Sequence, residues 1–267
     1  MPQFRLRDGA ELHYETHGKG PPLFLVAGLG GDGRFWTPQL EELGRHFTVV
    51  VHDHRGTGRS TLSRIAYSVA QMADDALQLI EGLGYHKVHW CGHSTGGAMG
   101  QVLAIEHPDR VDRLVLSATW GKTDAYFRRL FENRSLVLRE LGPEAYTRSS
   151  ALVLHMPSWV RDHDTELAAL EAKAQETIPI PEIVLSRIAA IVAHDQRDRL
   201  ATVRAPTLAI CARDDVVTPF YFTEELVRLI PGARAHALEN GGHFYPNVHG
   251  AEFRRVMTSF LLEPRAS

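Results

Sequence analysis

The chain has 267 residues, of which 44% are hydrophobic and 23% charged, an ordinary composition for one large or two small globular domains. Its 29 basic and 32 acidic side chains give a net charge of −3, which does not favour nucleic acid or an anionic membrane as a partner. Two cysteines make no disulfide framework and no run approaches ~18 apolar residues, so we expect a cytoplasmic protein without a membrane helix.

Short apolar runs recur along the chain and predict strands. Most of them end at Gly or Asp, which is typical of strands buried on both faces of a parallel sheet. The first run alternates between apolar and polar residues and instead indicates an edge strand. The predicted strands cover residues 12–16, 23–27, 47–51, 88–91, 111–117, 207–211 and 233–238.

Helical patterns lie between these strands. The apolar residues from Met72 to Leu83 repeat at helical spacing and stop at Gly84. Residues 95–107 and 253–262 predict two further helices, and Thr218-Pro219 reads as the N-cap and first residue of another. Strands that alternate with helices predict an α/β fold with a mostly parallel sheet.

One stretch breaks this alternation. From residue 122 to residue 202 the pattern is helical and has few strand signals. We therefore expect a core made of residues 1–121 and 203–267, with residues 122–202 inserted as a helical cap.

The strongest chemical signal is Gly92-His93-Ser94-Thr95-Gly96, which directly follows a predicted strand and opens a predicted helix. G-x-S-x-G in this context is a nucleophile elbow, in which a sharp turn exposes the serine hydroxyl above the carboxyl edge of the sheet. The neighbouring glycines remove side chains that would clash in such a turn. We predict that Ser94 is a nucleophile.

A serine nucleophile needs a base, and the base needs an orienting carboxylate. His243 follows two glycines after the strand-like run 233–238. Asp215 follows the strand at 207–211, and Asp214 is the alternative acid. The order Ser94, Asp215, His243 is the chain order of this kind of triad.

An oxyanion hole requires two backbone N–H donors. Thr95 supplies one, as the residue after the nucleophile. The glycine-rich run Ala27-Gly28-Leu29-Gly30-Gly31 follows a buried strand, and Leu29 is its best candidate for the second donor.

The remaining candidates are a possible metal cluster and two aromatic residues that we predict bind substrate. His52-Asp53-His54 resembles a metal cluster but has no third ligand at suitable spacing, so we interpret it as a structural turn and predict no metal. Trp120 follows a strand and is either a pocket wall or core. Phe244, next to His243, is the second predicted substrate-binding residue.

Together these motifs resemble those of the α/β-hydrolase superfamily over nearly the full length of the chain. The resemblance implies a sheet of about eight strands with a helical cap. Within the superfamily, residues 27–40 (AGLGGDGRFWTPQL) and 70–75 (AQMADD) resemble 3-oxoadipate enol-lactonase-like proteins and aminoacrylate (carbamate) hydrolases. Ala27 departs from the pattern, because a histidine is common before the oxyanion glycine.

These features predict a serine hydrolase that cleaves a small carboxylic ester or lactone through an acyl-enzyme at Ser94, as a monomer or homodimer and without a metal or organic cofactor. Two alternatives stay open. One is a catabolic hydrolase of C–N (amide or carbamate) or C–C bonds that uses the same triad. The other is a ligand-binding protein that has kept the triad.

Overall fold

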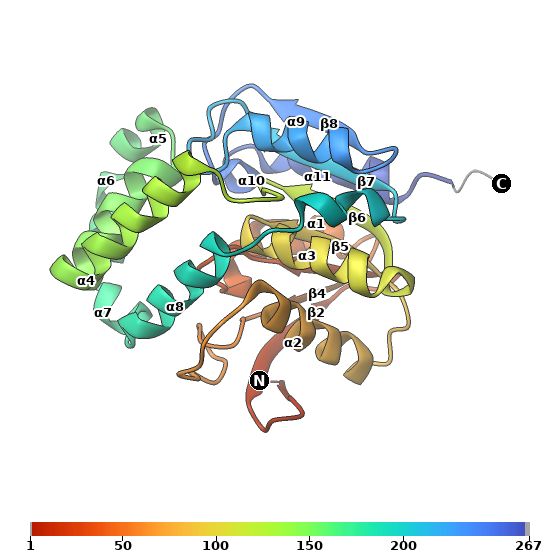
Figure 1. Cartoon of the computed structure of the whole chain (residues 1–267), viewed down its shortest axis with the longest axis horizontal. Helices are drawn as coiled ribbons and strands as arrows, with labels where there is room; N and C mark the ends of the chain where they lie inside the picture. The colour runs from red at the N-terminus through yellow and green to blue at the C-terminus, as the bar shows by residue number, and fades with distance from the viewer. Residues whose placement is uncertain (1, 265–267) are drawn as a thin grey trace.

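The computed structural model describes residues 2–264, and an eight-stranded sheet forms its centre (Figure 1). The strand order is β1-β2-β4-β3-β5-β6-β7-β8. Strands β1 and β2 are antiparallel to their neighbours, and the rest of the sheet is parallel. The prediction of a mostly parallel α/β sheet is therefore confirmed. The strands are β1 (Gln3–Arg5), β2 (Glu11–His17), β3 (Pro22–Val26), β4 (Thr48–His52), β5 (Val88–His93), β6 (Val111–Ser117), β7 (Thr207–Ala212) and β8 (Arg234–Leu238).

The predicted edge strand at residues 12–16 is not at the edge. It forms the middle of β2, and β1 covers its outer side, with Phe4 opposite Leu12. β1 has only three residues, Gln3, Phe4 and Arg5, and two of them are exposed. A strand this short and polar carries no hydrophobic pattern, so the sequence did not reveal it.

The sheet separates two apolar layers, because side chains alternate along each buried strand. On β3, Leu23 and Leu25 face the layer that contains α1 (Thr37–Leu43) and α11 (Gly250–Leu261). Phe24 and Val26 face the layer built with α2 (Val69–Gly82), α3 (Thr95–Glu106) and α9 (Phe220–Leu229).

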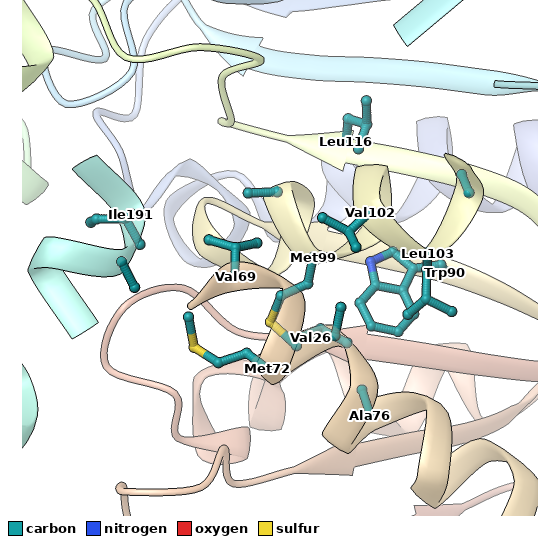
Figure 2. Close-up of a cluster of buried hydrophobic side chains, with 14 of the residues drawn as sticks. Val26, Val69, Met72, Ala76, Trp90, Met99, Val102, Leu103, Leu116 and Ile191 are labelled. Atoms are coloured by element: carbon teal, nitrogen blue, oxygen red, sulfur yellow. The ribbon is translucent and has the colours of Figure 1, made fainter. Parts of the chain in front are cut away.

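Figure 2 shows part of this second layer, where side chains of α2 and α3 meet above the sheet. In this view Met99 of α3 lies between Met72 of α2 and Trp90 of β5, and all three side chains are at most 2% exposed. Ile191, from a helix far along the chain, closes the same cluster. The packing anchors α3, whose first residue follows Ser94.

Five helices are inserted between β6 and β7 and lie to one side of the sheet (Figure 1). The longest is kinked at Gly142, which has φ +80°, and Pro143 follows. The inserted helices are α4 (Ala125–Leu154), α5 (Pro157–Asp162), α6 (Asp164–Ala172), α7 (Ala174–Thr177) and α8 (Pro181–Val192). We call α4–α8 the cap. The remaining short helices are η1 (Gly33–Trp36), η2 (Pro108–Arg110), η3 (Arg197–Thr202) and α10 (Tyr245–Val248).

The two ends of the insertion meet at the base of the cap. Lys122 and Asp195 form an isolated β-bridge, and the ammonium of Lys122 lies 2.7 Å from the Asp195 carboxylate. The N–H of Gln196 donates to the carbonyl of Gly121 at 2.8 Å. Across residues 2–264, none of the helices combines the length and the apolar character needed to cross a bilayer.

The His194 side chain connects the lower end of the cap to α3. Its side chain is 5% exposed, its ring meets Trp120 edge-on at 5.8 Å, and its Nε2 lies 3.4 Å from the Gln101 side-chain oxygen. Burial disfavours the charged imidazolium and lowers the pKa of His194 to about 4. The folded protein therefore holds this histidine neutral.

Acid should weaken the fold through His194. The unfolded chain takes up a proton near pH 6.5 and the folded chain only near pH 4, so the stabilisation is complete above pH 6.5 and is lost as the pH falls toward 4. The gap corresponds to about 3 kcal/mol. Urea unfolding at pH 7 and pH 4 measures how much the free energy of unfolding changes with pH. His194→Gln should make that change smaller by about 3 kcal/mol. The exposed His86→Gln is the matched control, and an equal effect of both substitutions contradicts the assignment.

Candidate active site

Ser94 lies at the sharp turn between β5 and α3. Its backbone has φ +53° and ψ −116°, in the left-handed range that side chains other than glycine rarely adopt. The turn is tight, because a Cβ at Gly92 would lie 2.0 Å from the carbonyl oxygen of Gly96, and a Cβ at Gly96 would lie 2.3 Å from that of Val26. The Ser94 N–H is held by the Ser117 carbonyl at 2.8 Å. The surrounding backbone therefore imposes the strain at Ser94.

Asp215 follows β7, and its carboxylate is fully buried. One oxygen, Oδ1, accepts the N–H groups of Val217 at 2.7 Å and Thr218 at 3.0 Å. The other, Oδ2, accepts the Thr218 hydroxyl at 2.9 Å and lies 2.8 Å from His243 Nδ1. These donors fix the carboxylate in one orientation.

Thr218 therefore acts differently from the sequence prediction. It does not cap the following helix: α9 begins at Phe220, Pro219 is its N-cap residue, and no side chain caps it. The Thr218 hydroxyl is used on Asp215 instead. An aspartate that accepts N–H groups two and three residues later forms an Asx-type turn, and the Asp-x-x-Thr spacing is the signal that could have revealed this role.

His243 lies on the loop between β8 and α10. Its Nδ1 meets Asp215, which leaves Nε2 as the nitrogen able to serve a nucleophile. Its ring lies 4.8 Å from that of His93, the residue before Ser94. Among the described residues no hydrogen bond joins Ser94 to His243; such contacts are often long in unliganded enzymes and shorten when substrate binds. Ser94 and His243 are only 6% and 3% exposed.

Asp214, the alternative acid, takes a separate position. It is exposed, and its two carboxylate oxygens accept the N–H groups of Gly241 at 3.2 Å and Gly242 at 2.9 Å. Both glycines have positive φ, at +126° and +63°. Asp214 therefore holds the loop that carries His243, while Asp215 contacts the imidazole.

The glycine-rich loop after β3 packs against Ser94. A Cβ on Gly28 would lie 3.1 Å from Ser94 Cβ and 3.6 Å from its hydroxyl oxygen. No hydrogen bond among the described residues uses the Leu29 N–H. The Thr95 N–H is the first of α3 and has no intrahelical partner. Two backbone donors are thus available beside Ser94, on the loop and at the helix N-terminus.

The His93 side chain is buried beside the Ser94 turn. Its Nδ1 lies 3.0 Å from the Ser117 hydroxyl, and its ring stacks on Phe35 at 4.9 Å. Burial and the neighbouring His243 hold its pKa well below the usual value. A neutral, buried imidazole at this position avoids a second positive charge beside His243.

His52-Asp53-His54 forms a structural turn. Asp53 accepts the Gly33 N–H at 2.8 Å and pairs with Arg59 at 2.8 Å, while the two histidine rings stack at 5.1 Å. Burial lowers the pKa of His52 to about 4. Within residues 2–264 no group of three or more His, Cys, Asp or Glu side chains is arranged to hold a metal ion.

The two predicted substrate-binding residues have different environments. Trp120 is fully buried and packs on Phe127 of the cap at 4.4 Å, so it belongs to the joint between cap and core. Phe244 is partly exposed and lies beside the His243 ring at 6.1 Å. His155 of the cap meets Phe244 edge-on at 4.9 Å, and the Phe244 N–H donates to the Leu154 carbonyl at 3.1 Å. The cap thus touches the loop that carries His243 directly, a contact the sequence did not indicate.

Comparison with known proteins agrees with this arrangement. A family model described as the alpha/beta hydrolase fold matches residues 21–246. A protein of Azorhizobium caulinodans named "Putative carbamate hydrolase RutD" is 38% identical over 254 residues, which cover 95% of this chain and 96% of that protein. A protein of the same name from Serratia proteamaculans is 38% identical over 261 residues, covering 94% and 96%.

Among solved structures, the enol-lactonase from Burkholderia xenovorans LB400 superposes with a TM-score of 0.90 and 27% identity, covering 98% of this chain and all of that one. A thermophilic esterase from Thermogutta terrifontis superposes with a TM-score of 0.86 and 26% identity, covering 98% of both chains.

Replacing Asp215 should lower the reactivity of Ser94 far more than replacing Asp214. Asp215→Asn removes the carboxylate that orients His243 and should slow labelling of Ser94 by a fluorophosphonate about 10³–10⁴-fold. Asp214→Asn keeps a side chain that can accept the loop N–H groups and should slow labelling less than about 10-fold. Stopped-time labelling followed by mass spectrometry measures both rates. A larger loss in the Asp214 variant would reverse the two roles.

Proposed function

The chain belongs to the alpha/beta hydrolase fold family, and on that premise we propose that it is a serine hydrolase that cleaves a small carbamate or amide at its C–N bond. The observation that carries the proposal is the 2.8 Å contact between buried Asp215 and His243, on a loop that brings the imidazole beside the strained Ser94 turn. This arrangement supplies a nucleophile, a base and an orienting acid in one place.

In the first half of the reaction, His243 Nε2 takes the Ser94 hydroxyl proton as the oxygen attacks the substrate carbonyl. The carbonyl oxygen becomes negative and is bound by the Leu29 and Thr95 N–H groups. Asp215 holds the imidazole in the tautomer with Nδ1 protonated and stabilises the imidazolium. His243 then gives its proton to the departing nitrogen, the C–N bond breaks, and an acyl group stays on Ser94.

In the second half, a water molecule attacks the acyl group while His243 accepts its proton. A second tetrahedral intermediate forms at the same two N–H donors and collapses, and Ser94 recovers its proton from His243. Every step uses side chains and backbone groups of this chain, so the mechanism needs neither a metal nor an organic cofactor.

Two lines of support favour C–N cleavage of a small substrate. The relatives that match along 94–95% of this chain at 38% identity bear a carbamate hydrolase name. The site is also enclosed, since Ser94 and His243 are at most 6% exposed, Phe244 lies beside His243, and the rings of Phe35 and His155 pack on Phe244. An enclosed site strengthens the charge interactions that expel a poor leaving group such as an amine.

The second candidate is hydrolysis of a small ester or lactone by the same residues. It is supported by the structural neighbours, an enol-lactonase and an esterase, which superpose over 98% of this chain. Their identity, 26–27%, is lower than that of the carbamate hydrolase relatives. The chemistry differs only in the leaving group, so substrate comparison separates the two candidates.

Three chromogenic substrates make that comparison: p-nitrophenyl acetate as the ester, p-nitroacetanilide as the amide, and methyl N-(4-nitrophenyl)carbamate. We expect kcat/KM for the carbamate or amide within about 10-fold of that for the ester, although amines leave less readily than phenolates. Ser94→Ala should lower all measurable rates by at least about 10³-fold, because the nucleophile acts in every case.

The other outcomes assign the function differently. Ester turnover without amide or carbamate turnover supports the esterase or lactonase candidate. No turnover of any substrate, together with no fluorophosphonate labelling of Ser94, contradicts both candidates and leaves the ligand-binding alternative. His243→Ala serves as the second knock-out, since it removes the base while leaving the Ser94 turn intact.

A further inference from the structure

Arg187 of cap helix α8 reaches across to the oxyanion loop. Its Nε and one Nη both donate to the Leu29 carbonyl, at 3.2 and 3.0 Å. The other Nη donates to the Arg55 carbonyl at 3.1 Å, and His54 Nδ1 lies 3.0 Å from the guanidinium. Arg187 is fully buried, with no exposed surface.

The contacts of this guanidinium are all to neutral groups. No Asp or Glu among the described residues lies within ion-pair distance of it, and its remaining neighbour is the face of the Tyr67 ring at 5.6 Å. Burial lowers the pKa of Arg187 to about 10, which still leaves it charged at neutral pH. Burying a cation without a paired carboxylate carries a large desolvation free energy. An apolar side chain would hold the cap on the core without that penalty. The charge therefore requires a reason other than cap packing.

The loop itself shows what the cation fixes. The Leu29 N–H and the Gly28 carbonyl belong to the same peptide group. In that group the Gly28 carbonyl accepts a hydrogen bond from the Gly31 N–H at 3.0 Å. The next peptide carries the Leu29 carbonyl, which Arg187 holds with two N–H groups. Both peptide planes beside Leu29 are thus anchored, one within the loop and one from the cap. Without Arg187, the second plane has no hydrogen-bond partner among the described residues.

Glycines make room for this approach. A Cβ on Gly31, which has φ +65°, would lie 2.9 Å from Arg187 Nη2. A Cβ on Gly56, which has φ +83°, would lie 2.8 Å from the side chain of Ile183, one helical turn before Arg187 on α8. Two loops of the core are therefore shaped to receive one face of this cap helix.

We propose that Arg187 is a positioning residue of the oxyanion hole: it holds the Leu29 carbonyl so that the Leu29 N–H stays aimed at the substrate oxygen on Ser94. The hole is then complete only while α8 is seated on the core. The cation is bound to the loop whose N–H receives the substrate oxygen, and negative charge develops on that oxygen in the transition state, so the cation also favours that charge. This inference rests on the proposed function, because it assigns Leu29 as an oxyanion donor.

The test compares Arg187→Met and Arg187→Lys with Arg134→Met. Arg134 is the matched control: it is a buried cap arginine whose guanidinium, among residues 2–264, hydrogen-bonds only to Tyr146 and Ser150, both within α4. The readouts are kcat and KM for the best substrate, the inhibition constant of phenylboronic acid, and Tm. The boronate forms a tetrahedral adduct on Ser94 and reports binding of the oxyanion without turnover.

We expect Arg187→Met to lower kcat about 10- to 100-fold and to weaken boronate inhibition by the same factor, with KM changed less than about 3-fold. Arg187→Lys, which keeps the charge and one donor, should recover part of both losses. Arg134→Met should lower Tm while leaving kcat and boronate inhibition unchanged.

The inference is overturned if Arg187→Met lowers Tm but leaves kcat and boronate inhibition within about 2-fold of the wild type. Where the methionine variant does not fold, the same criterion applies to Arg187→Lys. The inference is overturned as well if Arg134→Met weakens boronate inhibition equally. Wild-type protein that neither turns over substrate nor binds boronate contradicts the proposed function itself, and the inference fails with it.

Discussion

The turn at Ser94 is the constraint on which the site depends. A serine with φ +53° is held there because Gly92 and Gly96 allow β5, α3 and β3 to approach within distances that no Cβ permits. The same close approach places the Gly28 backbone against Ser94. Both candidate oxyanion donors, Leu29 and Thr95, are therefore positioned by the packing that strains Ser94. The buried layer around Met72, Met99 and Trp90 keeps α3 in place and so maintains the turn.

Asp215, His243 and the cap are tied to this turn through separate loops. Asp215 is fixed by its own following residues and in turn orients His243, while Asp214 holds the loop from which His243 projects. The cap contacts the site through the Leu154 carbonyl and the His155 ring at Phe244, and through Arg187 at the Leu29 carbonyl. The helical insertion is consequently part of the site as well as a cover over it.

Much of the fold could be predicted because its signals are local. Apolar runs ending at Gly or Asp mark strands buried on both faces, and the G-x-S-x-G turn needs its glycines within five residues. What escaped prediction lacks such a local signal or carries one that also fits another structure. β1 is three residues long and polar, Thr218 precedes a proline and resembles a helix cap, and Arg187 meets Leu29 across 158 positions of sequence. Nothing in the sequence distinguishes this arginine among 29 basic residues as one that binds a distant carbonyl group.

The central claim, that Ser94 forms a covalent intermediate at this site, is tested most directly by trapping that intermediate. A dimethylcarbamate with a p-nitrophenyl leaving group should transfer one dimethylcarbamoyl group per chain, because the resulting serine carbamate hydrolyses slowly. Intact-mass spectrometry and peptide mapping should place the group on Ser94, with p-nitrophenol released in equal amount. An unmodified protein under these conditions, or a group mapped to another residue, would contradict the account.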